Sequence, residues 1–286
     1  MLMPLPPRAG GLIRLVFVDV DGTLVGSGSR IHPSVWPAAD HARAVGVRLS
    51  LCSGRPGFGV SRSYAERLDP AGWHIFQNGA SIVHLPIGAS RSMHFAPDVV
   101  TSLIARARAT GRQLELYTDT DYVVEQTSDR ARAHALLLGV PFNPRPFESL
   151  AGPFVRAQWV VPLDQAPAID AEPHPGLEMS SSTSPVMPDT QFMNMTPDGV
   201  SKAAAVRAVA AGYGVPLDEV MFVGDGWNDI DAMRIIGHPV AMANAEPEVR
   251  TVARTMVADV DDGGLAQALA LAAGAGVGAG AGAARI

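Results

Sequence analysis

The residues best suited to chemistry are two aspartates that stand one residue apart. In the stretch FVDVDGTLVG, residues 17–26, Asp19 and Asp21 end an apolar run, and Asp225 ends a second apolar run, EVMFVGD. In open parallel sheets, ligands bind beyond the carboxyl ends of the strands, which is where these carboxylates are expected. A crowded carboxylate cluster is destabilising unless a cation neutralises it, and oxygen ligands select a hard ion such as Mg²⁺.

Polar residues also follow two further strand-like runs. Ser53 and Gly54 follow the run VRLSLCS, and Asn78 stands in the turn that ends WHIFQNGA. Taken singly, each has an ordinary explanation, because aspartates start turns and serines cap helices. Taken together, four strand ends that carry such residues indicate one site at the carboxyl edge of a sheet.

The elements that must position these residues alternate between apolar strands and alanine-rich helices, which is typical of a parallel sheet with crossover helices. We expect strands at 12–19, 47–53, 73–80, 219–225 and 238–245 and helices at 32–46, 56–69, 201–214 and 228–237. The predicted fold class is α/β, with a doubly wound parallel-sheet core.

A segment of different character interrupts this alternation. Between about residues 84 and 195, proline-rich spacers separate LELYTDTDYVVE and VRAQWVVP, whose alternation predicts half-exposed antiparallel strands. The later stretch SSSTSPVMPDTQFMN is interpreted either as the lining of a substrate cleft or as a flexible linker. We therefore predict core residues 1–83 and 196–273, with an inserted α+β cap domain at 84–195.

Composition narrows the class of protein. The chain has 286 residues, is 47% hydrophobic and carries a formal net charge of -6, so we expect a soluble protein that binds neither nucleic acid nor membranes. A single cysteine, Cys52, indicates a buried thiol in a reducing compartment, and residues 1–11 lack the apolar segment of a signal peptide. The cytoplasm is the expected location, and no pattern indicates the oligomeric state.

The C-terminal stretch LAQALALAAGAGVGAGAGAA carries no charge over roughly the length of a membrane span. Alanine and glycine gain little from hydrocarbon, and glycine disfavours an isolated helix. We therefore prefer a short helix near residues 265–273 and a disordered tail at 274–286 over a membrane anchor.

Four segments, in order, resemble the motifs of the haloacid dehalogenase superfamily. They are DVDGTL at 19–24, LCSGR at 51–55, Lys202 in GVSKAAAV, and GDGWNDIDAM at 224–233. The cap placed between the second and third motifs, together with QNGA, TPDGVSK and VAMANA, resembles the Cof-like sugar-phosphate phosphatases, to which mannosyl-3-phosphoglycerate and sucrose phosphatases are related.

The resemblance implies a mechanism for the paired aspartates. Asp19 would attack phosphorus and form an aspartyl-phosphate, and Asp21 would protonate the leaving oxygen and later recover the proton. Gly22 would let the chain turn immediately, so that Asp21 reaches the same phosphoryl group. Because dehalogenases of the superfamily lack this second acid, Asp21 favours a phosphatase.

The other implied roles concern phosphate and metal. Ser53 and the Gly54 amide would hold phosphate oxygens, and Lys202 would bridge the nucleophile and the phosphoryl group. Magnesium would be bound by Asp19, the backbone carbonyl of Asp21 and Asp225, and Asp229 would be either a ligand or an orienter of Lys202. The remaining candidates for phosphate or substrate are Arg55, Asn78 and Asn228.

The predicted function is magnesium-dependent hydrolysis of a small phosphorylated metabolite, a sugar or polyol phosphate. Two alternatives remain: a phosphosugar mutase on the same fold, and a non-catalytic regulatory protein that binds a phosphometabolite. In the cap, a sugar could be contacted by Tyr117, Asp119, Asp121 and Tyr122. The alternative is that TDTD is a hairpin turn of solvated polar residues, and this interpretation is slightly favoured.

Overall fold

The computed structural model describes residues 12–184 and 186–274, and these divide into two compact units. The first unit holds residues 12–51 and 206–274, and the second holds the described residues of 52–205. Most of the predicted disordered tail lies outside the described residues, as does the N-terminal segment 1–11. The cap boundaries expected near residues 84 and 195 stay a prediction.

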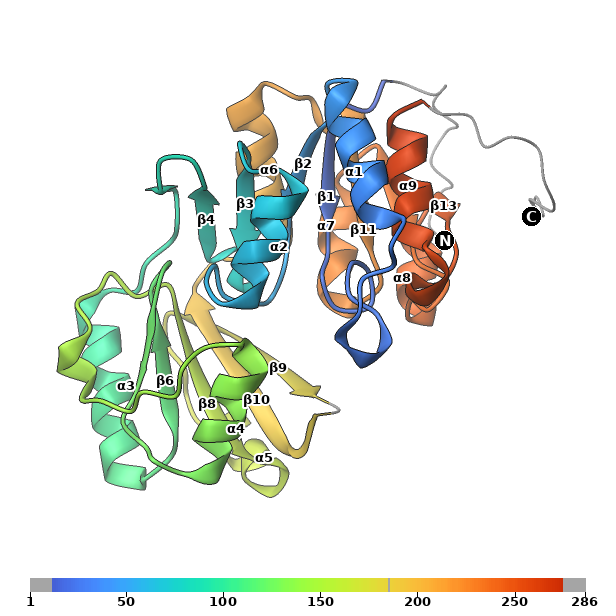
Figure 1. The fold of residues 1–286 in the computed structure, drawn as a ribbon. Helices are drawn as coiled ribbons and strands as arrows, with labels where there is room; N and C mark the ends of the chain where they lie inside the picture. Colours follow the sequence, from blue (N-terminus) through green and yellow to red (C-terminus); the bar gives the residue numbers. More distant parts are fainter. Residues whose placement is uncertain (1–11, 185, 275–286) are drawn as a thin grey trace, which may run out of the picture. The chain divides into compact units, whose positions relative to one another are not determined.

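The first unit contains the predicted parallel sheet, with strand order β13-β12-β11-β1-β2 (Figure 1). Its strands are β1 (Leu15–Val18), β2 (Arg48–Leu51), β11 (Val220–Gly224), β12 (His238–Ala241) and β13 (Thr255–Met256). The central strands β1 and β11 are buried along their whole length, which explains why their sequences are continuously apolar.

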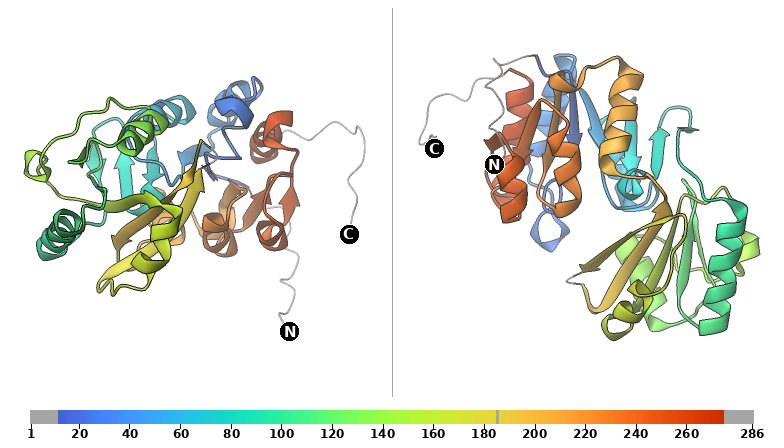
Figure 2. Two further views of the ribbon diagram at one scale, coloured as in Figure 1. Left: turned by 90° about the horizontal axis from the view of Figure 1, so that it is seen from below. Right: turned by 180° about the vertical axis from the view of Figure 1, so that it is seen from behind.

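Helices cover both faces of this sheet, as a doubly wound fold requires. They are α1 (Val35–Ala44), α6 (Lys202–Tyr213), α7 (Ile230–Arg234), α8 (Pro247–Val252) and α9 (Gly264–Ala272), of which α6 begins in the second unit. Helices α1 and α9 lie side by side on one face, and α7 and α8 lie on the other (Figure 2). Helix α9 confirms the short helix predicted before the tail.

The second unit is built around an antiparallel sheet with strand order β7-β6-β8-β10-β9. Its strands are β6 (Leu114–Tyr117), β7 (Tyr122–Val124), β8 (Arg156–Pro162), β9 (Leu177–Ser184) and β10 (Met187–Pro197). The helices that pack on this sheet are α3 (Pro97–Thr110), α4 (Asp129–Leu138) and α5 (Ala166–Asp170). The antiparallel strands predicted for this part of the chain are confirmed.

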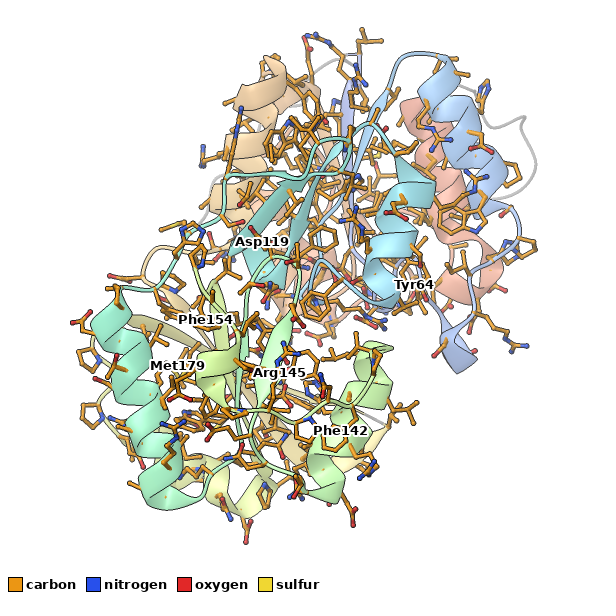
Figure 3. The ribbon with its side chains drawn as sticks, turned by 60° about the vertical axis from the view of Figure 1, so that its left-hand side comes forward. Tyr64, Asp119, Phe142, Arg145, Phe154 and Met179 are labelled. Carbon is orange, nitrogen blue, oxygen red and sulfur yellow. The ribbon has the colours of Figure 1, made fainter. Side chains whose placement is uncertain are left out.

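The expectation that these strands are half-exposed is wrong. Strands β6 and β7 are buried throughout, and β8 is buried except at Pro162. One face packs against α3 and α5 in a core that Phe154 and Met179 border (Figure 3). The other face packs against α4, so the polar residues of the alternating pattern are buried rather than solvated.

Two further expectations for the second unit are corrected. Within the stretch SSSTSPVMPDTQFMN, residues 180–184 belong to β9 and residues 187–194 to β10, so these segments are paired strands rather than a flexible linker. The TDTD turn is also not simply solvated, because Asp119 accepts hydrogen bonds from Ser81 and Ser92, at 2.5 and 2.7 Å. Asp121 pairs with Arg145 at 2.6 Å; Figure 3 labels Asp119 and Arg145.

The strand expected at 73–80 is shorter than predicted and lies in a separate sheet. Strand β3 (Trp73–Phe76) pairs antiparallel with β4 (Ser81–His84), which continues to β5 (Ala89–Ser90). The predicted Asn-Gly turn joins β3 to β4, and Asn78 in it has a left-handed φ of 55°. Helix α2 (Val60–Leu68) precedes this sheet.

No helix among residues 12–184 and 186–274 is long and apolar enough to cross a membrane.

Candidate active site

Three acidic side chains meet at the carboxyl edge of the parallel sheet in the first unit. Asp19, Asp225 and Asp229 each offer a carboxylate oxygen, and these oxygens lie within 4.8 Å of one another. Asp229 is fully buried and Asp19 is 6% exposed. Carboxylates that are this close together and largely shielded from water repel one another unless a cation lies between them. The set of oxygen donors therefore fits a hard divalent ion.

The sheet register explains how residues 206 positions apart come together. Strands β1 and β11 pair in parallel, with Val18 opposite Val223, and the amide of Asp19 donates to the carbonyl of Val223 at 3.0 Å. Asp225 follows β11 directly, so both acids emerge from neighbouring strand ends. Asp229 follows one turn later, at the end of the 3₁₀ helix Trp227–Asp229.

The carboxylates fit because two neighbouring positions are glycines, which have no side chain to fill the same space. A Cβ on Gly22, whose φ is +81°, would lie 2.0 Å from Oδ2 of Asp225, and a Cβ on Gly224 would lie 2.4 Å from Oδ2 of Asp229. The same Oδ2 of Asp229 accepts the backbone amides of Asp225 and Gly226, each at 3.1 Å. Any larger residue at either glycine would displace a carboxylate of the cluster.

Two uncharged side chains position the loops around the cluster. The buried Thr23 donates its hydroxyl to Oδ1 of Asp225 at 2.8 Å. Asn244 donates to the carbonyl of Gly22 at 2.8 Å and accepts the amide of Val260 at 3.1 Å. Sequence reasoning missed Asn244, although it lies in the loop that follows β12, at the same edge of the sheet as Asp225 after β11.

The other predicted residues of the first unit lie near this cluster in sequence but are more exposed. Asp21 and Asn228 are both exposed, and Asp21 is not among the three clustered acids. Asp231, two residues after Asp229, is exposed and pairs with Arg234 at 3.2 Å. Asp21 and Asn228 are therefore accessible to a ligand from solvent.

The negative charge of the cluster extends to its rim. Partial burial raises the pKa of Glu246, and the neighbouring charges of Glu248 and Asp229 raise it further. The backbone amide of Glu246 also donates to the carbonyl of Asp225 at 3.0 Å. Negative potential at this edge of the sheet favours a cation there.

The predicted phosphate-binding residues form a compact group within the second unit. The amide of Arg55 donates to Oγ of Ser53 at 3.0 Å, and the amide of Asn78 donates to the carbonyl of Ser53 at 3.0 Å. A Cβ on Gly54 would lie 3.1 Å from Oδ1 of Asn78. Ser53 is buried, and these hydrogen bonds within the turn hold its backbone in place.

Lys202 is the first residue of α6 and is buried, with 3% of its surface exposed. The start of α6 packs closely on the Asn-Gly turn, because a Cβ on Gly79 would lie 2.3 Å from the carbonyl oxygen of Ser201. Lys202 therefore differs from the solvated lysine that is usual at a helix start. Lys202 and Asp19 belong to different units, and the bridge predicted between them stays a prediction.

The sequence profile of haloacid dehalogenase-like hydrolases matches residues 16–151 and 171–269. The chain belongs to the haloacid dehalogenase-like hydrolase family. The superfamily predicted from the four motifs is thus confirmed, as are the fold class and the enzyme class, a phosphatase of this superfamily.

Relatives match nearly the whole length of this chain. "Putative phosphatase M6_Spy0533" of Streptococcus pyogenes is 25% identical over 269 residues, which cover 90% of this chain and 97% of the relative. "Putative phosphatase YxeH" of Bacillus subtilis is 25% identical over 266 residues, with the same coverage.

Solved structures share the fold. A haloacid dehalogenase-like hydrolase from Bacteroides thetaiotaomicron is 25% identical, with a TM-score of 0.80 over 90% of this chain and 98% of that one. A subclass IIB sugar phosphatase of the superfamily is 23% identical, with a TM-score of 0.73 over 90% of this chain and 97% of that one.

Proposed function

We propose that this member of the family is a magnesium-dependent phosphatase that hydrolyses a small phosphorylated metabolite, a sugar or polyol phosphate. The observation that carries the proposal is the carboxylate cluster, in which oxygens of Asp19, Asp225 and Asp229 lie within 4.8 Å. The sugar or polyol class rests on the resemblance of QNGA, TPDGVSK and VAMANA to Cof-like phosphatases.

In the proposed reaction, a carboxylate oxygen of Asp19 attacks phosphorus, and the bond from phosphorus to the ester oxygen breaks. Asp21 protonates the leaving oxygen. Water then attacks the aspartyl-phosphate, Asp21 takes its proton, and orthophosphate and the free Asp19 carboxylate result. The exposure of Asp21 supports this role, because the group must reach both a leaving alcohol and water.

Asp19, Asp225, Asp229 and the backbone carbonyl of Asp21 would hold Mg²⁺. When bound, the ion would neutralise phosphoryl charge and orient the ester. We favour a ligand role for Asp229 over the orientation of Lys202, because its carboxylate belongs to the clustered set.

The residues of the second unit are proposed to bind the substrate. Ser53, the Gly54 amide, Arg55 and Asn78 would bind phosphate oxygens, and Lys202 would neutralise their charge. Asn228 of the first unit would donate to phosphate or to a water molecule. Residues 84–195 would act as the cap that selects the substrate, and the cytoplasm is the proposed location.

Metal dependence tests this proposal. Chelation of divalent ions should abolish phosphate release from an aryl phosphate, and Mg²⁺ should restore it better than Ca²⁺, whose looser coordination geometry suits in-line attack poorly. The measurement is released orthophosphate before and after dialysis against chelator. Full activity in excess chelator would contradict the proposed site.

A further inference from the structure

The second unit buries an arginine that none of the assigned roles uses. Arg156 begins β8 and is 4% exposed. Its guanidinium carbon lies 4.0 Å from the centre of the Tyr117 ring, and its Nη1 donates to the carbonyl oxygen of Gly54 at 3.0 Å. A residue of the antiparallel sheet is thus in direct contact with the predicted phosphate-binding turn.

The charge of Arg156 is not neutralised by a carboxylate within the described part of the chain. Its Nε is buried and has no hydrogen-bond partner there. The nearby acid Glu115 is already engaged by Tyr117, Gln113 and His134. Burying an arginine without a counter-ion is costly, so the position of this guanidinium calls for an explanation beyond packing.

The turn itself supplies that explanation. The peptide between Gly54 and Arg55 is fixed at both ends, because its carbonyl accepts from Arg156 and its amide donates to Oγ of Ser53 at 3.0 Å. A serine hydroxyl has one proton to donate, and here its oxygen already serves as an acceptor. The Ser53 proton therefore remains available for a phosphate oxygen.

We propose that Arg156 is a positioning residue for phosphate binding. It fixes the Gly54–Arg55 peptide and places a buried positive charge beside the turn, where it hydrogen-bonds to the Gly54 carbonyl. The inference rests on the proposed function, because it takes the turn at Ser53 and Gly54 as the phosphate-binding element. A purely structural role would instead tie β8 to the turn without affecting affinity for phosphate.

The test compares Arg156→Met with the parent protein in Mg²⁺. Methionine keeps an apolar side chain over Tyr117 but removes the charge and the donor. We expect the KM for an aryl phosphate and the inhibition constant of orthophosphate each to rise about tenfold, in line with the loss of a hydrogen bond from a charged group. The expected change in kcat is smaller, and calorimetric titration with orthophosphate should show the same loss of affinity.

Two further variants separate positioning from folding. Arg156→Lys keeps the charge but not the planar fork, so its constants should rise about threefold, between those of the parent and the methionine variant. Arg130→Met removes another arginine of the same unit, which bonds to Thr190 and Asp189, and should leave both constants unchanged. Melting temperatures of all variants report on folding.

Unchanged constants in a folded Arg156→Met, even with a lower melting temperature, would overturn the inference. If that variant does not fold, unchanged constants in Arg156→Lys would overturn it. Failure of the proposed function looks different: the parent would release no phosphate from any ester, although orthophosphate would still bind in an Arg156-dependent way.

Discussion

At the scale of single residues, the carboxylate cluster depends on the absence of a side chain at Gly22. A Cβ there would lie 2.0 Å from Asp225, and the backbone already has a left-handed φ of +81°. We expect Gly22→Ala to lower kcat/KM about 100-fold, because a displacement of about 1 Å at a reacting centre can have an effect of this size. Phosphate release from an aryl phosphate measures it.

Gly28→Ala is the matched control for this prediction. Gly28 has a left-handed φ of +62°, but its Cβ would meet nothing closer than 3.7 Å. Both variants carry the left-handed backbone penalty of about 1–2 kcal/mol, and only Gly22→Ala also displaces a carboxylate. Equal activity of the two variants would show that the close approach of Gly22 to Asp225 is unimportant.

Residue types could be predicted from the sequence better than residue contacts. Asp19 and Asp225 stand out because each ends an apolar run, and Asp229 lies in the motif GDGWNDIDAM that follows the second run; the structure brings the three together. Asn244 and Arg156 escaped prediction because an asparagine in a turn and an arginine on a strand are common. Their roles follow from hydrogen bonds to the carbonyls of Gly22 and Gly54, which no spacing in the sequence reveals.

At the scale of elements, β3 buries a titratable group that should make stability depend on pH. His74 is fully buried, its Nε2 lies 2.8 Å from the carbonyl of Asp69, and burial lowers its pKa to about 4. The unfolded chain takes up this proton near pH 6.5. The stability contribution is therefore complete above pH 6.5 and is lost as the pH falls towards 4.

The expected loss is about 3 kcal/mol, since a full proton contributes about 1.4 kcal/mol per pH unit. Urea denaturation of the parent and of His74→Gln at pH 7, 5.5 and 4.5 measures it. The free energy of unfolding should fall more steeply in the parent, because glutamine cannot titrate. Parallel pH profiles would contradict this account of His74.

Elements in the first unit were easier to predict than those in the second. Strands β1 and β11 are buried on both faces, so their continuous apolar runs identify them directly. Strands β6 and β8 carry polar residues such as Glu115 and Gln158 that alternate with apolar ones, which indicates solvent exposure. Those residues are buried instead, because α4 covers that face, and Glu115 is hydrogen-bonded to His134 at 2.8 Å.

At the scale of the whole molecule, the residues proposed for the reaction are divided between two units. The first unit carries the carboxylates that could hold a cation, and the second carries Ser53, Gly54, Asn78 and the buried Lys202. The four motifs and the QNGA turn predicted this set, because each follows a strand or begins a helix. The substrate is less accessible to prediction, since the residues of the proposed cap that would select it share no recognisable spacing.

The central claim is that Asp19 is the nucleophile of a phosphatase. The most direct test measures orthophosphate released by the parent and by Asp19→Asn, with Mg²⁺, from an aryl phosphate and a panel of phosphorylated metabolites. The account predicts release by the parent, with a preference among sugar and polyol phosphates, and no release by Asp19→Asn, whose amide cannot form the acyl phosphate. Equal release by both proteins would contradict it.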